Sequence, residues 1–135
     1  VIDGLARMKI PYHHSNLTNY SDLGQYYNAI DLYLVTSREE GGPRAILESM
    51  ASGIPLVTSK VGQAVDLVAH GLNGWMVNVG EVSEAAYWVK YALEHRDSNS
   101  EILVNAYRTA VDNCYSAQMP KWRKFMNGFI SQSEY

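Results

Sequence analysis

The chain has 135 residues, 47% of them hydrophobic, and a formal net charge of −3, so we expect one domain with its own core. The charge gives no support to nucleic-acid binding, and a single cysteine, Cys114, excludes an internal disulfide and fits a reducing compartment. No apolar run approaches the roughly 18 residues of a membrane span and no signal-peptide pattern is present, so we expect a cytoplasmic protein.

The first third of the chain predicts two helices and two strands. Residues 2–8 have the pattern of a helix end, and residues 9–14 that of a short edge strand, because Pro11 lacks an N–H. Ser21 is expected to cap a helix that runs to Asn28. The apolar run 32–35 then predicts a strand.

The stretch SREEGGPRAILESMASG, residues 37–53, predicts a glycine-rich turn followed by a helix. Pro43 suits the first helical position, where its missing N–H has no cost, and Gly53 suits the left-handed residue that ends the helix. A strand, a glycine-rich turn and a helix start in this order direct backbone N–H groups and a positive dipole end towards an anion such as phosphate.

Two carboxylates frame this turn, Glu40 before the helix and Glu48 roughly one and a half turns into it. Both can border a ligand whose phosphates lie at the helix start. A carboxylate accepts paired hydrogen bonds from a vicinal diol, which ribose and sugars both carry. The spacing is therefore compatible with a cradle for a nucleotide sugar, although spacing alone favours two glutamates without a ligand.

Beyond Gly53, short apolar strands alternate with helices. Asn73-Gly74 is a turn dipeptide, because both residues tolerate a positive φ. Ser83 is expected to cap a helix that residues 97–100 break. The other predicted elements are strands at 55–58 and 75–79, helices at 64–70 and 102–113, and an apolar stripe of Ala86, Val89, Ala92 and Leu93 on the helix after Ser83.

The C-terminal residues 118–135 are predicted to form a separate amphipathic helix that starts at Pro120. Its apolar residues recur at helical spacing from Trp122 to Ile130, beside the cations Lys121, Arg123 and Lys124. We expect this helix to dock on the protein body. Peripheral contact with a membrane surface is the alternative.

Alternating strands and helices predict an α/β fold with a parallel sheet flanked by helices. Ligands of such sheets bind beyond the carboxyl ends of the strands, which is where the turn at residues 37–43 lies.

The ordered pattern Ser-x-x-Glu40-Gly…Leu-Glu48-x-Met-Ala-x-Gly-x-Pro-x-Val resembles the signature of retaining GT-B glycosyltransferases, glycosyltransferase family 4 in particular. Residues 26–31, 61–68 and 71–77 continue the pattern in the expected order. The resemblance implies that residues 1–117 are a partial nucleotide-sugar-binding, Rossmann-like domain from the C-terminal half of a GT-B fold.

The resemblance also implies roles for single residues. Glu40, the expected catalytic residue, would contact hydroxyls of the transferred sugar, and Glu48 would hold the ribose diol. Gly41 and Gly42 would bring backbone N–H groups to the sugar and the diphosphate, and Leu47 would pack near the ribose.

Three further residues are weaker candidates for substrate binding. Tyr12 and His13, with the adjacent His14, fall where the family borders the base, and a plain loop or strand histidine is the favoured alternative. Arg44 could reach a phosphate, although a solvent-facing or carboxylate-paired Arg is more common. No residues have metal-ligand spacing, so no metal and no other cofactor is expected.

The implied activity is transfer of a sugar from a UDP- or GDP-sugar to an acceptor hydroxyl with retention of configuration. The family often has Gly-Phe-Gly where this chain has residues 41–43, and Gln63 and Asp66 also depart from its pattern, which leaves the donor open. The alternatives are a non-catalytic sugar-nucleotide-binding or interaction module, and a related GT-B enzyme such as a sugar-nucleotide epimerase or a glycogen-synthase-like polymerase.

The family's acceptor domain and the opening strands of its donor domain have no counterpart here, and the chain starts at Val1 rather than at a methionine. We therefore expect a piece of a longer chain that is inactive alone. The family's strand order places the missing strands between residues 9–14 and 32–35. This predicts an exposed apolar edge and self-association, or a shifted first strand that closes the gap.

Overall fold

The computed structural model describes residues 2–14, 16, 19–42 and 44–131. Within this part of the chain the strands form one parallel sheet in the order β1 (Tyr33–Val35), β2 (Leu56–Ser59), β3 (Trp75–Val77). Leu34 lies opposite Val57, and Thr58 lies opposite Met76. The three strands predicted at 32–35, 55–58 and 75–79 are thus confirmed, with ends that differ by one or two residues.

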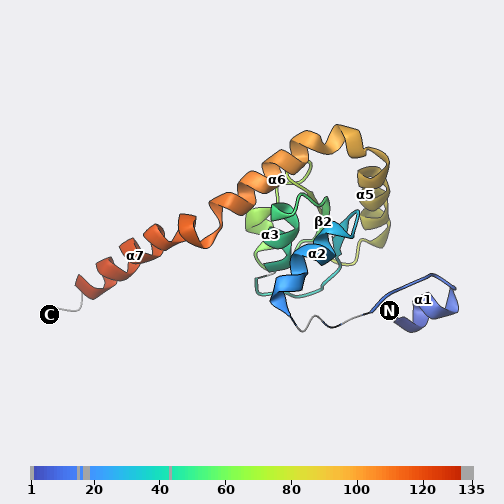
Figure 1. Cartoon of the computed structure of the whole chain (residues 1–135), viewed down its shortest axis with the longest axis horizontal. Helices are drawn as coiled ribbons and strands as arrows, with labels where there is room; N and C mark the ends of the chain where they lie inside the picture. The colour runs from blue at the N-terminus through green and yellow to red at the C-terminus, as the bar shows by residue number, and fades with distance from the viewer. Residues whose placement is uncertain (1, 15, 17–18, 43, 132–135) are drawn as a thin grey trace.

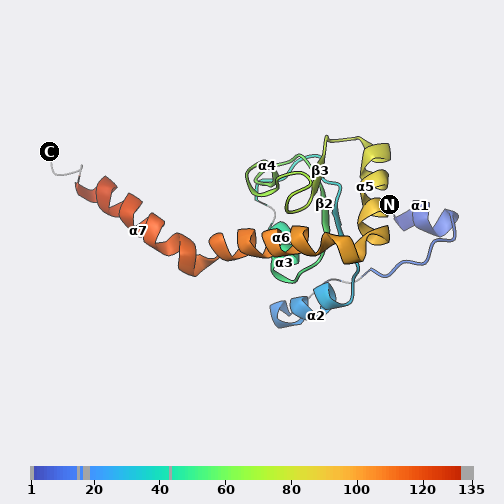
Figure 2. The same cartoon turned by 90° about the horizontal axis from the view of Figure 1, so that it is seen from above.

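Helices cover both faces of the sheet (Figures 1 and 2). α3 (Arg44–Ala51) and α6 (Ser100–Asp112) pack on one face, where Ile46, Met50 and Leu56 are in the core with Ala106 and Ala110. α5 (Val82–Glu94) packs on the other face through Ala92, against Val57 and Trp75. All four residues of β2 are buried, and successive side chains of this strand point to opposite faces of the sheet, so β2 contributes to the core on both faces.

The remaining elements are short segments at the edges of this body. They are α1 (Ile2–Arg7), the 3₁₀ turns η1 (Tyr20–Asp22) and η2 (Arg96–Asn99), α2 (Leu23–Asn28) and α4 (Ala64–Leu67), with α7 (Tyr115–Ser131) at the end of the chain.

The end of α3 forms as predicted. Gly53 has φ of +70°, and the Ile54 N–H donates to the Ser49 carbonyl at 3.0 Å, which is the left-handed helix end expected of a glycine there. Pro43, the predicted first helical residue, lies outside the described residues.

The strand predicted at residues 9–14 is wrong. Lys9 has φ of +55°, which turns the chain after α1, and residues 10–14 run on without pairing to another strand. A strand is held by hydrogen bonds to a neighbour, and the apolar pattern alone supplies none. β1 therefore pairs with β2 alone among the described residues, and its other edge stays open; self-association through that edge remains a prediction.

Two predicted helix caps are also wrong. Ser21 lies inside η1 and Ser83 inside α5, and neither α2 nor α5 has a side-chain cap. α2 needs none, because η1 continues directly into it and the Leu23 N–H donates to the Tyr20 carbonyl. The predicted stripe on α5 is displaced as well: Ala92 is buried, but Ala86 and Leu93 are exposed, and Trp88, Val89 and Tyr91 complete the packed face.

The turn predicted at Asn73-Gly74 is present for a different reason, since neither residue has a positive φ. Asn73 is buried, and its amide nitrogen donates to the Leu67 carbonyl and the Thr109 hydroxyl, both at 2.9 Å. Its side-chain oxygen accepts the Ala69 N–H at 2.8 Å. These bonds replace helical ones, which explains why α4 ends at Leu67 and not at the predicted His70.

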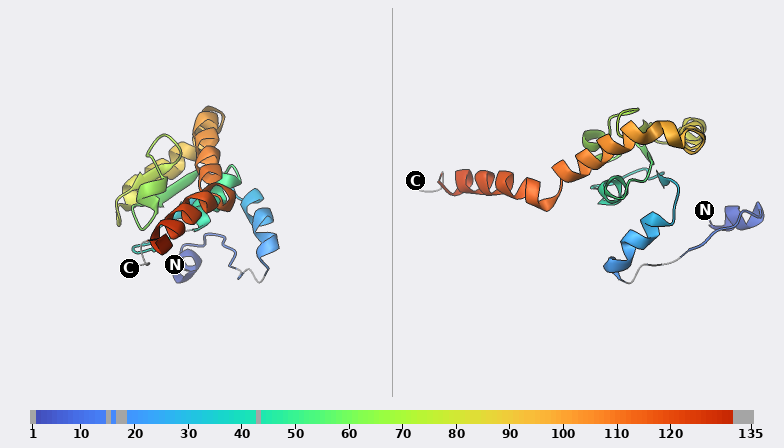
Figure 3. Two further views of the ribbon diagram at one scale, coloured as in Figure 1. Left: turned by 90° about the vertical axis from the view of Figure 1, so that its left-hand side faces the viewer. Right: turned by 45° about the horizontal axis from the view of Figure 1, so that its top comes forward.

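The last helix begins at Tyr115, and Pro120 lies inside it rather than at its start. Figures 1 to 3 show α7 projecting from the sheet and its helices. Trp122 is 61% exposed and Phe125 is 63% exposed, so the expected docking of this helix on the body is wrong for this chain. In the described part of the chain, no helix has the length and apolar character needed to cross a membrane.

Candidate functional site

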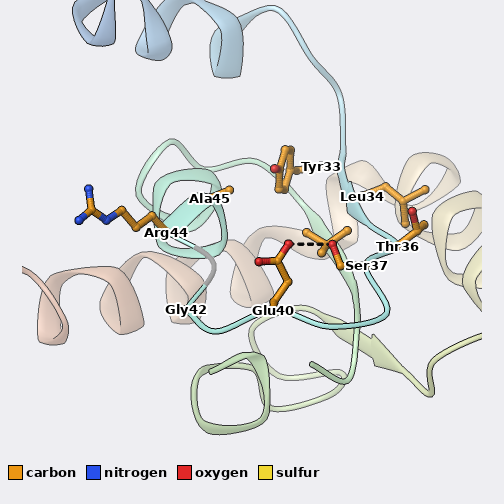
Figure 4. A pocket seen from close by; sticks show the side chains of 9 residues that line it. Tyr33, Leu34, Thr36, Ser37, Glu40, Gly42, Arg44 and Ala45 are labelled. Atoms are coloured by element: carbon orange, nitrogen blue, oxygen red, sulfur yellow. Dashed lines mark hydrogen bonds between the residues drawn. The ribbon is translucent and has the colours of Figure 1, made fainter. Parts of the chain in front are cut away.

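An open pocket of about 490 Å³ lies along β1 and the turn after it, beside the N-terminus of α3 (Figure 4). Its volume is in the range of small-molecule sites. Three of the predicted site residues, Glu40, Gly42 and Arg44, line it. The other lining residues are Tyr33, Leu34, Val35, Thr36, Ser37 and Ala45.

Glu40 is oriented by a short chain of hydrogen bonds from the ends of two strands. The Ser37 hydroxyl donates to Glu40 Oε1 at 2.8 Å, and the Ser59 hydroxyl at the end of β2 donates to the Ser37 carbonyl at 2.6 Å. In Figure 4, Tyr33, Ser37 and Glu40 face the same space. The sheet therefore fixes where the carboxylate of Glu40 lies.

The glycine-rich loop rests on the turn after β2. A Cβ on Gly62, which has φ of +46°, would collide with the Glu40 carbonyl oxygen and would come within 2.9 Å of the Gly41 oxygen. A Cβ on Gly42 would lie 3.2 Å from the Gln63 side-chain oxygen. Gly62 is therefore required by a close approach of two backbones as well as by its positive φ.

Glu48 accepts hydrogen bonds from two tyrosines. The Tyr20 hydroxyl donates to Oε1 at 2.7 Å, and the Tyr27 hydroxyl donates to Oε2 at 3.2 Å and lies 3.3 Å from the Ala45 carbonyl. Tyr27 is 5% exposed, whereas Tyr20 is 73% exposed. Neither tyrosine was predicted as a site residue; the one signal in the sequence is that Tyr27 falls in the family-like segment 26–31.

Tyr33 lies in the electrostatic field of both glutamates. Burial raises the pKa of its hydroxyl, and the negative charges of Glu48 and of Glu40 raise it further. Its ring also packs edge-on against Tyr27 at 5.6 Å. The structure thus places Glu40 in the lining of the pocket, while Glu48 and the predicted Gly41 lie outside that lining, and the charges of both glutamates act on Tyr33.

The same carboxylate affects the other two tyrosines. Burial is the main cause of the raised pKa of Tyr27, and the neighbouring Tyr33 and Glu48 raise it further. The hydrogen bond to Glu48 is the main cause of the raised pKa of Tyr20. Both hydroxyls therefore stay protonated, as hydrogen-bond donors, well above neutral pH.

The remaining predicted residues are not brought together. Arg44 lines the pocket, but its guanidinium points away from Glu40 (Figure 4). Leu47 is half-buried against the core, and Tyr12 and His13 are exposed in the segment before α2, outside the lining of the pocket. Among the described residues, no three His, Cys, Asp or Glu side chains lie close enough to hold a metal ion.

Comparison with known proteins shows the family. The model of the family "Glycosyl transferases group 1" matches residues 11–109, which include the strands, α3 and the pocket. The chain belongs to the group 1 glycosyl transferases.

Two curated relatives show what the chain is similar to. The capsular polysaccharide biosynthesis glycosyltransferase CapM of Staphylococcus aureus is 26% identical over 120 residues, 87% of this chain and 31% of the relative. The GDP-mannose-dependent alpha-mannosyltransferase of Corynebacterium glutamicum is 29% identical over 100 residues, 71% of this chain and 23% of the relative. The chain therefore spans less than a third of the length of these relatives.

A solved structure gives the same picture for the fold. The chain resembles Anabaena Alr3699/HepE in complex with UDP, with a TM-score of 0.78 and 27% identity over 93% of this chain and 35% of the other. The complex of that protein with UDP-glucose matches at 32% identity over 81% of this chain and 30% of the other, with a TM-score of 0.70. The predicted fold class, part of the C-terminal domain of a GT-B fold, is confirmed.

Proposed function

We propose that this chain is the donor-binding part of a retaining glycosyltransferase that transfers a sugar from a UDP- or GDP-sugar to an acceptor hydroxyl. The observation that carries the proposal is a pocket beside the start of α3 that Glu40 and Gly42 line, with Glu48 on the same helix held by two tyrosine hydroxyls. Two separate carboxylates suit a ligand with two separate sets of hydroxyls, which a nucleotide sugar has.

The proposed roles follow from where each group lies. Glu48 accepts hydrogen bonds from the ribose diol, and Glu40, oriented by Ser37, accepts them from the sugar. Gly41 and Gly42 offer backbone N–H groups beside the positive end of α3, where negative charge on a departing diphosphate is stabilised. The diphosphate helps to take the proton of the acceptor hydroxyl, so the site needs no protein nucleophile and works by positioning and charge.

The charge around the pocket supports the proposal that this chain is inactive alone. Arg44 is the one cation among the lining residues, and its side chain points away from Glu40. Stabilising a departing diphosphate during transfer needs more positive charge than binding the nucleotide does, and we propose that a part of a longer chain supplies it together with the acceptor site.

The relatives support polysaccharide or glycoconjugate synthesis as the setting, but they differ in the nucleotide. One relative is a GDP-mannose-dependent enzyme, and the solved complexes of another contain UDP or UDP-glucose. Both nucleotides therefore belong in the test.

The test is an NMR titration of the 135-residue chain with UDP, GDP and their common sugar conjugates. We expect shifts centred on Gly41, Gly42 and Glu48. Replacing Glu48 by Gln should weaken binding by about 1–3 kcal/mol, because charge-assisted hydrogen bonds to the ligand are lost.

The control for this substitution is Glu101→Gln, at an exposed position in the first turn of α6, which removes the same charge away from the pocket. Equal affinity of the Glu48→Gln variant and the wild-type chain would remove Glu48 from the site. Shifts confined to other regions would refute the proposal as a whole.

A further inference from the structure

Glu48 is the only proposed ligand-binding carboxylate of the described residues whose two oxygens both already accept side-chain hydrogen bonds. The two donors are the same chemical group in very different surroundings. Tyr27 comes from α2 and is buried, and Tyr20 comes from η1, which has no buried residue.

The contacts of Tyr27 fix its position. Its ring packs against Tyr33 at 5.6 Å, and its hydroxyl lies between Glu48 Oε2 and the Ala45 carbonyl on α3. These contacts restrain both the ring and the hydroxyl of Tyr27, so the hydroxyl has a single position. The bond to Oε2 therefore fixes the rotation of the carboxylate and aims Oε1 outwards.

Tyr20 occupies the outward oxygen. Its hydroxyl lies 2.7 Å from Oε1, the distance of a charge-assisted O–H···O bond, while most of its side chain is in solvent. A sugar hydroxyl that binds Glu48 would donate to the same oxygen in the same way. Arg44, one helical turn before Glu48, does not compete for it, since the ion pairs among the described residues are Lys90–Glu94 and Arg96–Asp31.

We propose that Tyr27 is a positioning residue for Glu48 and that the Tyr20 hydroxyl takes the place of a ligand hydroxyl on Oε1, from which the ligand displaces it. This inference rests on the proposed function, because it needs Glu48 to bind a ligand diol. It adds that the Tyr20 hydroxyl makes on Oε1 the hydrogen bond that a ligand hydroxyl would make. It also predicts that Tyr20 and Tyr27 affect the affinity for nucleotides that carry the ribose hydroxyls and not the affinity for those that lack them.

The test measures the affinity of the 135-residue chain for UDP and GDP and for their 2′,3′-dideoxy forms, which lack the diol. Tyr20→Phe keeps the ring and removes the competing hydroxyl, so it should tighten ribonucleotide binding by about threefold to tenfold and leave dideoxynucleotide binding unchanged. Tyr27→Phe should weaken ribonucleotide binding by a similar factor and reduce the preference for the ribo form. Tyr107→Phe, on the exposed side of α6, is the matched control and should change neither affinity.

The outcomes separate this inference from the proposed function. If the wild-type chain and the Tyr20→Phe variant bind neither nucleotide, or if Glu48→Gln does not weaken binding, both proposals fail. If Glu48→Gln weakens binding but the tyrosine variants keep the wild-type ratio of ribo to dideoxy affinity, the proposed function stands and this inference is wrong. Weaker ribonucleotide binding by Tyr20→Phe would show that Tyr20 contacts the ligand and is not displaced by it.

Discussion

Asn73 shows how one buried side chain can determine a loop. Three hydrogen bonds join it to Leu67, Ala69 and Thr109, so the turn between α4 and β3 is tied to α6 on the same face of the sheet. Gly74 completes the turn for steric reasons, because a Cβ there would lie 3.3 Å from the Leu56 carbonyl oxygen. The pair is structural, as the sequence predicts, although through burial and not through positive φ angles.

At this scale we predict that Asn73→Ala lowers the free energy of unfolding by about 1–3 kcal/mol, because buried polar groups of Leu67 and Ala69 lose their partners. Urea denaturation measures the change. The control is Asn105→Ala, whose exposed amide donates to the Leu72 carbonyl at 3.2 Å and should change stability by less than about 0.5 kcal/mol. Equal effects of the two substitutions would contradict the role given to Asn73.

Among the elements, the turn after β2 and the loop before α3 form one unit. Gly62 allows the two backbones to touch, and the hydroxyl of Ser59 links the end of β2 to the Ser37 carbonyl. The loop that carries Glu40 is thus supported by the strand next to its own. This is why its conformation does not follow from the residues of the loop alone.

We predict that Gly62→Ala destabilises the chain by at least about 1 kcal/mol more than Gly71→Ala does. Both glycines have a positive φ, but only at Gly62 would the new Cβ meet backbone atoms; none lie within 4 Å at Gly71. Thermal denaturation gives the stabilities, and NMR shifts of Gly41 and Gly42 report the loop. If the loop signals move equally in both variants, the close approach at Gly62 does not support the loop.

On the scale of the whole molecule, the chain is a helix–sheet–helix body with a projecting arm (Figure 3). None of the described side chains of α7 belongs to the core, and Pro120 removes one hydrogen bond from within this helix. Its exposed aromatic residues give the body no burial energy. The body should therefore fold without most of α7.

We predict that removal of residues 119–135 changes the free energy of unfolding by less than about 1 kcal/mol. The shorter chain keeps Gln118, whose amide donates to the Asp112 carbonyl at 2.7 Å and ends α6. Urea denaturation, monitored by far-ultraviolet circular dichroism, gives the free energy of unfolding of both chains. Loss of the cooperative transition in the shorter chain would show that α7 supports the body.

The sequence by itself determined the three strands, the helix after the glycine-rich turn, its end at Gly53 and the family. These features depend on local patterns: apolar runs, helical spacing and glycine at a left-handed position. The ordered residues from Ser37 to Gly53 also placed Glu40 and Glu48 on either side of one helix start.

Only the tertiary structure decided the rest. Residues 9–14 have the pattern of a strand but pair with no strand in the described part of the chain, and Trp122, Phe125 and Met126 of α7 are exposed. Tyr20 and Tyr27 donate to Glu48 from η1 and α2, and Tyr33 of β1 lies in the field of both glutamates. Contacts between segments that are distant in the chain leave no periodicity in the sequence, since they depend on how the elements pack, and the partners of Glu48 are visible only after folding.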